Sequence, residues 1–162
     1  MFLVQKRFSD VDIAALKVVY SQTISKIDYE ADWRFCAEQC FIEDLRHFFE
    51  IPNGKLFVLR IDGKTVSALR SEPYADGELF SYLETAPEMR GTGYGSDLVA
   101  ESIRYLAQQG THRIYAHVNK KNLPSLAVHR ANGFCIYSDY AKLLDGTVSQ
   151  NYYTLQYNST AE

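Results

Sequence analysis

The stretch PEMRGTGYGSDL, residues 87–98, places three glycines directly before a run of residues with helical spacing. Glycine loses more conformational entropy on folding than any other residue, so this concentration needs a physical reason. A strand, a glycine-rich turn and the first turn of a helix together expose backbone N–H groups at the positive end of the helix dipole. The stretch therefore predicts a binding site for an anion, most often a phosphate.

Two common phosphate-binding motifs do not fit this loop. A Walker A loop requires Gly-Lys followed by Ser or Thr, whereas Ser96 and Asp97 follow Gly95 here. A dinucleotide fingerprint, G-x-G-x-x-G, read from Gly91 meets Ser96 at its last position. The alternative is that the glycines only permit a tight turn, but a turn needs one such residue and not three at alternate positions.

Around the loop, the chain alternates between predicted strands and helices. We expect strands at 2–8, 56–61, 65–74, 78–85, 112–118, 134–140 and 151–157, and helices at 11–20, 30–50, 96–109 and 123–132. Asp62-Gly63 between apolar runs is a strong hairpin signal, and Ser9 with Asp12 forms a variant of the capping box. The order β-α-α-β-β-β-α-β-α-β-β predicts an α/β (α+β) fold, with helices packed on a mixed sheet in a single domain, 1–162.

Composition excludes several classes of protein. The chain has 162 residues and a net charge of −3, without a basic patch, so nucleic acid is not an expected partner. No apolar run approaches the roughly 20 residues that span a membrane. The odd number of cysteines and an N-terminus without a long apolar stretch predict a reducing, cytoplasmic location. Cys36 and Cys40 share a helix face, where two buried thiols are favoured over a zinc site, and no metal is expected.

Two motifs together carry a family resemblance. Arg90, Gly93 and Gly95 read R-x-x-G-x-G, and a second pattern, N-x-x-A-x-x-L-Y-x-x-x-G-F, is matched in spacing by Asn122, Ser125, Val128, His129, Gly133 and Phe134. With these motifs and its element order, the chain resembles the GNAT superfamily of N-acetyltransferases over essentially its whole length. The resemblance implies a mostly antiparallel sheet of about seven strands with helices on both faces. It also implies transfer of an acetyl group from acetyl-CoA to a primary amine of a small molecule or peptide.

The resemblance assigns the cofactor-binding residues. In the family, this loop wraps the pyrophosphate of acetyl-CoA, which implies contacts from Arg90, Gly91, Thr92, Gly93, Tyr94, Gly95 and Ser96. Backbone N–H groups at the end of the preceding strand, here Thr85 and Ala86, are expected to polarise the thioester carbonyl. Asn122 matches an asparagine that binds the pantetheine arm, and it is equally well placed to cap the helix that follows.

The catalytic positions depart in part from the family pattern. His129 stands where the family usually has a tyrosine that protonates the leaving thiolate, and histidine can also donate a proton. The alternatives for His129 are a helix-surface side chain or a role in positioning the cofactor. Glu84, two residues before Ala86 on an apolar strand, is the first candidate for general base, while the alternative is a structural carboxylate paired with a neighbour. Glu72 and Glu78 are weaker candidates.

Two residues are candidates for contacting the acceptor. Tyr82 is expected to share a pocket wall with Phe80. Asp44 falls within the apolar stripe of helix 30–50, where it holds a cationic substrate or is turned outward by a break between two shorter helices. The acidic excess of residues 28–50 mildly favours a basic acceptor. Because the tyrosine is missing, a non-catalytic acyl-CoA sensor or interaction module is the alternative function, and a homodimer is a further expectation.

Overall fold

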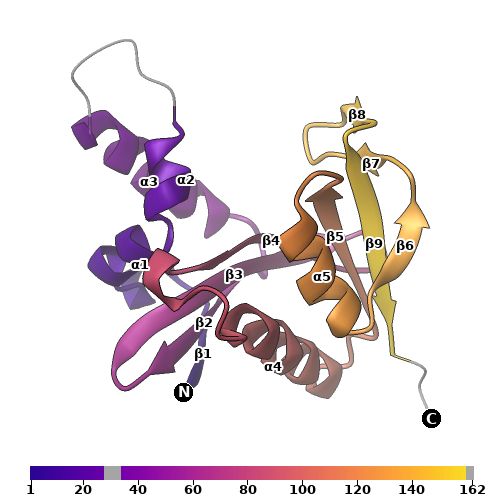
Figure 1. Cartoon of the computed structure of the whole chain (residues 1–162), viewed down its shortest axis with the longest axis horizontal. Coiled ribbons are helices and arrows are strands. Elements are labelled where there is room, and N and C mark those ends of the chain that lie inside the picture. Colours follow the sequence, from indigo (N-terminus) through magenta and orange to yellow (C-terminus); the bar gives the residue numbers. More distant parts are fainter. Residues whose placement is uncertain (28–33, 160–162) are drawn as a thin grey trace.

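The protein, described here from a computed structural model of residues 1–27 and 34–159, is built on one large twisted sheet (Figure 1). Its strands lie in the order β1-β2-β3-β4-β5-β9-β6. The strands are β1 (Phe2–Gln5), β2 (Lys55–Ile61), β3 (Lys64–Tyr74), β4 (Gly77–Thr85), β5 (Arg113–Asn119), β6 (Cys135–Ser138) and β9 (Tyr152–Asn158). Every neighbouring pair is antiparallel except β4 and β5, which run parallel. This confirms the predicted mixed, mostly antiparallel sheet.

Helices cover both faces of the sheet. The helices are α1 (Ile13–Val19), α2 (Ser21–Ser25), α3 (Arg34–Phe48), α4 (Tyr94–Gln108) and α5 (Leu123–Ala131), with 3-10 turns η1 (Phe8–Asp10) and η2 (Pro87–Met89). On the face covered by α1–α3, buried side chains such as Tyr20 and Leu45 pack against Val58 and Ala68 of the sheet. We call this side the α1–α3 face.

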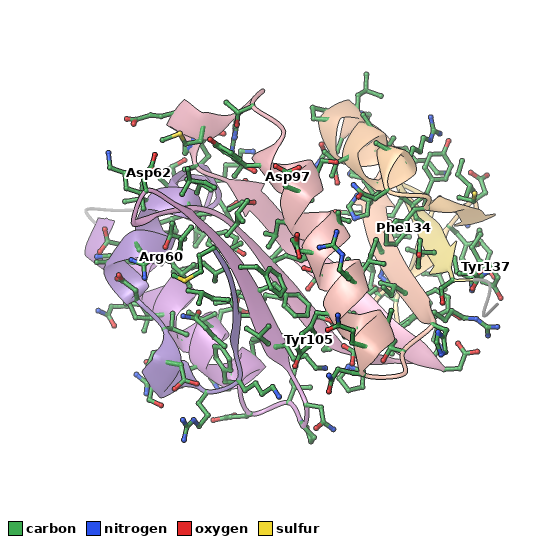
Figure 2. The ribbon with its side chains drawn as sticks, turned by 90° about the horizontal axis from the view of Figure 1, so that it is seen from below. Arg60, Asp62, Asp97, Tyr105, Phe134 and Tyr137 are labelled. Carbon is green, nitrogen blue, oxygen red and sulfur yellow. The ribbon has the colours of Figure 1, made fainter. Side chains whose placement is uncertain are left out.

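The opposite side, which we call the α4 face, has its own apolar core. Leu98 and Leu106 of α4 pack there against Phe57 and Leu69. Tyr105 extends the contact toward the N-terminal strands, with its ring edge-on to Phe57 (Figure 2). Leu126 places α5 on this face too. The sheet is therefore sandwiched, and strand residues alternate between the two cores.

The sheet opens between β4 and β5. Their pairing runs only from Glu78↔Ile114 to Phe80↔Ala116, although β4 continues to Thr85 and β5 to Asn119. Strand β4 also carries a bulge, because Ala68 pairs with Glu84 but Arg70 pairs with Ser81, which leaves Tyr82 and Leu83 opposite a single residue. Tyr82 has a φ of 53° at this bulge. The opening lies immediately before the glycine loop and α4, and it positions the site described below (Figure 1).

Several predicted boundaries need correction. Asp12, and not Ser9, caps α1, since its carboxylate accepts from the Ala15 amide at 3.0 Å. The start of the predicted helix 30–50, including Trp33, lies outside the described residues. The short helix α2 was not predicted as a separate element. Between β6 and β9, a turn at Asp145-Gly146 joins two further short strands that were not predicted, β7 (Ala141–Lys142) and β8 (Val148–Ser149).

The expectation that Cys36 and Cys40 are two buried thiols is also corrected in part. Cys40 is exposed on α3, and the side chain of Cys36 is outside what the structure describes. The Asp62-Gly63 hairpin is confirmed, because both residues adopt positive φ, 48° and 78°, as a tight β2–β3 turn requires.

Candidate active site

The three loop glycines are needed for two different reasons. Gly91 and Gly93 adopt φ of 75° and 90°, in the left-handed region that L side chains rarely enter. Gly95 is already helical, but a Cβ at this position would lie 3.1 Å from the Thr85 hydroxyl oxygen. The first two glycines therefore shape the loop, and the third lets α4 approach the end of β4.

The loop leaves a row of backbone donors without partners. The amide of Asp97 donates to the Gly93 carbonyl at 3.0 Å and is the first amide of α4 to make such a bond. Within the described part of the chain, no hydrogen bond engages the amides of residues 91–96. These amides lead into and include the first turn of α4, a helix of 15 residues whose dipole adds positive potential at the same point. An arrangement of this kind is suited to the phosphates of a nucleotide or coenzyme.

The loop hydroxyls have different roles. Ser96 Oγ accepts a hydrogen bond from Asn132 Nδ2 at 2.9 Å, so its own proton stays available for an anion at the loop. Thr92 Oγ1 instead donates to the Met89 carbonyl and stabilises the turn. Asn132, which sequence reasoning missed, caps the C-terminal end of α5 and links it to the start of α4.

Arg90 is not directed at the expected phosphate position. Its Nε donates to the Thr85 carbonyl at 3.2 Å, and its Nη2 forms an ion pair with Glu84 Oε2 at 3.1 Å. Its Nη1 donates to the Gln22 side chain. The guanidinium therefore ties the loop to β4 and α2, which corrects the expectation that its charge holds the pyrophosphate.

At the end of β4, only one of the two predicted amides is free. The Ala86 amide donates to the Val66 carbonyl at 2.8 Å, which removes it from the expected donors. Successive amides along a strand point in opposite directions, so the Thr85 amide faces β5. Pairing with β5 has already ended at Phe80. Thr85 is thus the N–H donor that this geometry offers within the opening.

His129 is buried, with 3% of its surface exposed, so it is not a helix-surface residue. Its Nδ1 donates to the Ser125 carbonyl at 2.8 Å, and its ring lies edge-on to Phe134. Burial lowers the pKa of His129, and the Ser125 hydrogen bond only partly opposes this effect. At neutral pH the imidazole is therefore uncharged and its one proton is bound to a backbone carbonyl. A general acid needs a proton that it can give to the leaving thiolate, and the proton of His129 is not available for this.

Glu84 lies on the α1–α3 face with both carboxylate oxygens engaged. Oε1 accepts from Thr23 Oγ1 at 2.8 Å, and Oε2 pairs with Arg90. This matches the alternative of a structural carboxylate. Phe80 does not share a wall with Tyr82 as expected, because the bulge leaves Phe80 in the α4-face core while Tyr82 is half exposed. Of the weaker candidates, Glu78 is paired with Lys55 at 2.7 Å.

Asp44 and Asn122 also have defined partners. Helix α3 is continuous through Asp44, so the predicted helix break is wrong, but the side chain of Asp44 is turned outward as that alternative expected, with 53% of it exposed. Its Oδ2 pairs with Arg70 Nη1 at 2.7 Å. Asn122 caps α5 by accepting from the Ser125 amide at 3.2 Å, as one of its two predicted roles required. Tyr20 donates to the Tyr82 carbonyl at 2.7 Å and anchors the bulge.

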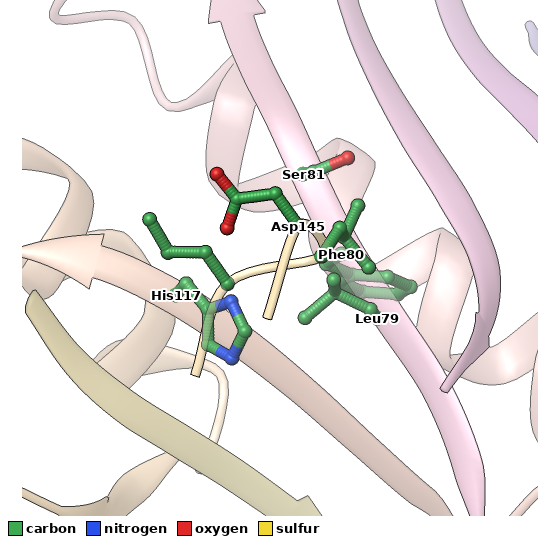
Figure 3. Close-up of a pocket in the computed structure, with 7 residues that line it drawn as sticks. Leu79, Phe80, Ser81, His117 and Asp145 are labelled. Atoms are coloured by element: carbon green, nitrogen blue, oxygen red, sulfur yellow. The ribbon is translucent and has the colours of Figure 1, made fainter. Parts of the chain in front are cut away.

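A pocket of about 340 Å³ lies where β4 and β5 part, and it contains two residues to which the sequence gave no role. It is lined by Leu79, Phe80, Ser81, His117, Leu143, Leu144 and Asp145 (Figure 3). His117 and Asp145 come from β5 and from the turn between β7 and β8. Because Ala116 and Val118 belong to the α4-face core, alternation places His117 on the α1–α3 face.

The charges of these two residues differ. Burial lowers the pKa of His117, so this imidazole is neutral at pH 7 and has a lone pair for a proton. Hydrogen bonds from the Thr147 side chain and amide lower the pKa of Asp145, which therefore stays ionised. The pocket combines a neutral base with an anion that attracts cations.

Comparison with known proteins agrees with this architecture. The chain matches the acetyltransferase (GNAT) family over residues 24–134, and it belongs to this family. No curated protein sequence matches it. The protein is thus a GNAT-family acetyltransferase, and enzymes of this family take the acetyl group from acetyl-CoA.

Solved structures are similar along nearly the full length. PaiA N-acetyltransferase from Thermoplasma acidophilum, in complex with coenzyme A, has a TM-score of 0.67 at 13% identity, covering 98% of this chain and 99% of that one. A ribosomal-protein-alanine N-acetyltransferase from Brucella melitensis has a TM-score of 0.68 at 20% identity, covering 97% and 99%. A point mutant of the spermidine N-acetyltransferase SpeG from Vibrio cholerae has a TM-score of 0.68 at 14% identity, covering 98% and 94%. At sequence identities this low, the similarity to these structures shows the fold alone.

Metal-binding clusters and membrane-spanning helices are both absent from the described residues. Among residues 1–27 and 34–159, no group of three or more His, Cys, Asp or Glu side chains is arranged to hold a metal ion. In the same part of the chain, no helix has both the length and the apolar character to cross a membrane.

Proposed function

We propose that the protein transfers an acetyl group from acetyl-CoA directly to a primary amine of a small molecule or peptide. The observation that carries this proposal is the row of unpartnered amides at residues 91–96, next to the opening between β4 and β5. The row suits the pyrophosphate, with Ser96 Oγ as an additional donor. The opening leads from there toward the pocket on the α1–α3 face, where the acceptor amine binds.

The reaction needs a donor for the thioester oxygen and a base for the amine. The Thr85 amide is the donor, since negative charge develops on the carbonyl oxygen as the amine nitrogen attacks the carbonyl carbon. The amine arrives as an ammonium ion, which Asp145 attracts, and it loses a proton to the neutral imidazole of His117. The C–N bond forms, the C–S bond breaks, and the coenzyme leaves as a thiolate.

His129 and Glu84 support this site without taking the roles that the sequence suggested. His129 fixes the start of α5 through its bond to Ser125, and it does not protonate the thiolate. A thiol of ordinary pKa, about 8.5, is already a fair leaving group and takes its proton from solvent. Glu84 holds Arg90 and Thr23, which keeps the glycine loop against α2. Asn122 has a free side-chain amide group for the pantetheine arm while its oxygen caps α5.

Thiol release tests this function. The purified protein, acetyl-CoA and a panel of polyamines, amino acids, aminoglycosides and peptides are expected to give amine-dependent release of CoA thiol. Calorimetry is expected to show binding of CoA and acetyl-CoA. Binding without turnover on any amine would favour the sensor over the enzyme. Absence of any binding would overturn both functions.

Location and assembly follow as lesser proposals. The exposed free thiols of Cys40 and Cys135 support a reducing, cytoplasmic location. Homodimerisation remains a prediction, and the edge strand β6, with exposed Ile136 and Tyr137, is the surface that suits it. Sedimentation of the wild type beside a Tyr137→Lys variant tests it, and a monomer in the wild type would contradict it.

A further inference from the structure

Arg70 is a buried arginine with an unpaired edge. It lies on β3, on the α1–α3 face, and only 3% of it is exposed. Its Nη1 donates to Asp44, but its Nε and Nη2 are buried and have no hydrogen-bond partner among the described residues. Buried polar groups of this kind are nearly always paired in folded proteins, so two unpaired donors on one side chain require an explanation.

The two unpaired donors lie on the same edge of the guanidinium. Nε–H and one N–H of Nη2 point in parallel, which is the arrangement that binds the two oxygens of a carboxylate. We call this pair of donors the fork. The guanidinium carbon lies over two aromatic rings, 4.2 Å from the ring centroid of Tyr82 and 5.2 Å from that of Phe48. Together with the ion pair to Asp44, these contacts limit the movement of the guanidinium. The fork is therefore preorganised.

Arg70 lies on the strand next to one that lines the proposed acceptor pocket, although its own side chain is not among the lining residues. Arg70 pairs directly with Ser81 of β4, and Ser81 lines the pocket together with His117 of β5. Residues paired across neighbouring strands share a face and lie about 5 Å apart. Arg70, Ser81 and His117 thus lie on three adjacent strands and on the same face of the sheet, near the point where the sheet opens.

The charges around Arg70 select the type of anion. Asp44 already neutralises part of its charge, and Glu72, two residues along the same strand face, is 4% exposed. A dianion such as phosphate would be repelled by these carboxyl groups, whereas a planar, singly charged carboxylate matches the fork.

We propose that the amine acceptor also carries a carboxylate, which Arg70 binds side-on through Nε and Nη2. The substrate class is then amino-acid-like, and not a simple polyamine. This inference rests on the proposed function, because it assigns the acceptor of that same site.

Matched amine pairs test it. Lysine and cadaverine, or ornithine and putrescine, differ only by the carboxylate. In the wild type, kcat/KM is expected to be at least about tenfold higher for the amino acid, the usual effect of a charged hydrogen-bonded pair. Arg70→Lys keeps the charge but loses the fork, so this ratio is expected to fall to about one, because the loss of rate falls mainly on the amino acid.

Arg60→Lys is the matched control. Arg60 also has a buried, unpartnered Nε, but its Nη2 donates to Gly63 at the far β2–β3 turn, so it has no free fork (Figure 2). This variant is expected to keep the wild-type ratio. A wild-type ratio near one would overturn the proposal. So would an Arg70→Lys variant that loses activity equally on both amines, because that result indicates a structural role or a fork filled by water or Glu72.

Calorimetry tests the proposed carboxylate site on Arg70 even if no turnover is observed. Lysine titrated into the CoA-saturated wild type is expected to bind at least about tenfold more tightly than into Arg70→Lys, with CoA affinity unchanged. If CoA does not bind, the proposed function fails, and lysine titrated into the protein alone still reports on the fork. Equal lysine affinity in the two proteins, in either titration, would reject the carboxylate site.

Discussion

The two faces of the sheet are built in different ways. On the α4 face, the proposed binding groups are backbone amides in one continuous segment, residues 91–96, together with the Thr85 amide at the end of β4. On the α1–α3 face, the groups are side chains from separate elements: Arg70 on β3, His117 on β5 and Asp145 in the turn between β7 and β8. A backbone site depends on chain conformation, whereas a side-chain site depends on which residues the fold brings together.

The largest effect is expected from a substitution at Gly93, which tests the backbone site of the glycine loop. A valine there must adopt a φ of 90° that β-branched residues avoid, so Gly93→Val is expected to reshape the loop and weaken acetyl-CoA binding by at least about a hundredfold. Calorimetry measures the affinity. Gly63→Val is the matched control, because Gly63 has a similar φ of 78° and equally open surroundings, but lies in the β2–β3 turn. If both variants bind acetyl-CoA equally, the loop conformation does not make the site.

A substitution at His117 tests the side-chain site on the α1–α3 face. His117→Gln is expected to lower kcat/KM by about a hundredfold, the usual contribution of a general base, with acetyl-CoA affinity unchanged. Because the pKa of His117 is lowered, the imidazole is neutral at pH 7, and wild-type activity is expected to fall only at a pH below about 6.5. The variant should lose this acid limb in a pH–rate profile. His112→Gln, at the opposite end of β5, is expected to retain both rate and limb.

Glu84 separates the sequence-based hypothesis from the structural one. Glu84→Gln is expected to keep kcat within about threefold and to leave the pH–rate profile unchanged. Its partly exposed pair with Arg90 and its bond to Thr23 predict a loss of about 1 kcal/mol in unfolding free energy. Urea denaturation measures this loss. A hundredfold fall in kcat with a lost acid limb would instead make Glu84 the base.

The smallest effect is expected from a substitution of His129. Its pKa in the folded protein is below that of the unfolded chain, so the unfolded state takes up a proton first as pH falls. Stability from this group is present above about pH 6.5 and is lost as pH falls through the folded pKa. In His129→Phe, the decrease in Tm between pH 7.5 and 5.5 should be shallower, though not absent, because His117 remains. A kcat more than tenfold below wild type would restore His129 as the acid.

Local signals predicted most of the fold. Asp62-Gly63 located the β2–β3 turn, because few residues other than Asn, Asp and Gly accept its positive φ. Helix α4 was recognised by its periodic apolar face, with Leu98 and Leu106 buried. The five residues of α2 and the two-residue strands β7 and β8 were missed as elements, because such short segments contain too few periods for a pattern to be recognised.

The site was predicted unevenly for a related reason. The loop glycines were recognised because their φ requirement acts within the loop itself. Arg90 was given a ligand-binding role through the family motif, and Asp44 was given one because it falls within the apolar stripe of its helix. In the structure Asp44 forms an ion pair with Arg70, which is distant in the chain. Arg90 forms an ion pair with Glu84 and also donates to the distant Gln22 side chain.

By itself, the sequence determined the order of strands and helices, the family and the anion-binding loop, since these depend on backbone propensities and on periodicity over a few residues. Only the tertiary structure decided which polar side chains are paired and which are left available. Hydrogen bonds and ion pairs are satisfied in space, between segments whose meeting is set by packing. Thus the buried fork of Arg70 and the neutral imidazole of His117 were visible only after the chain had folded.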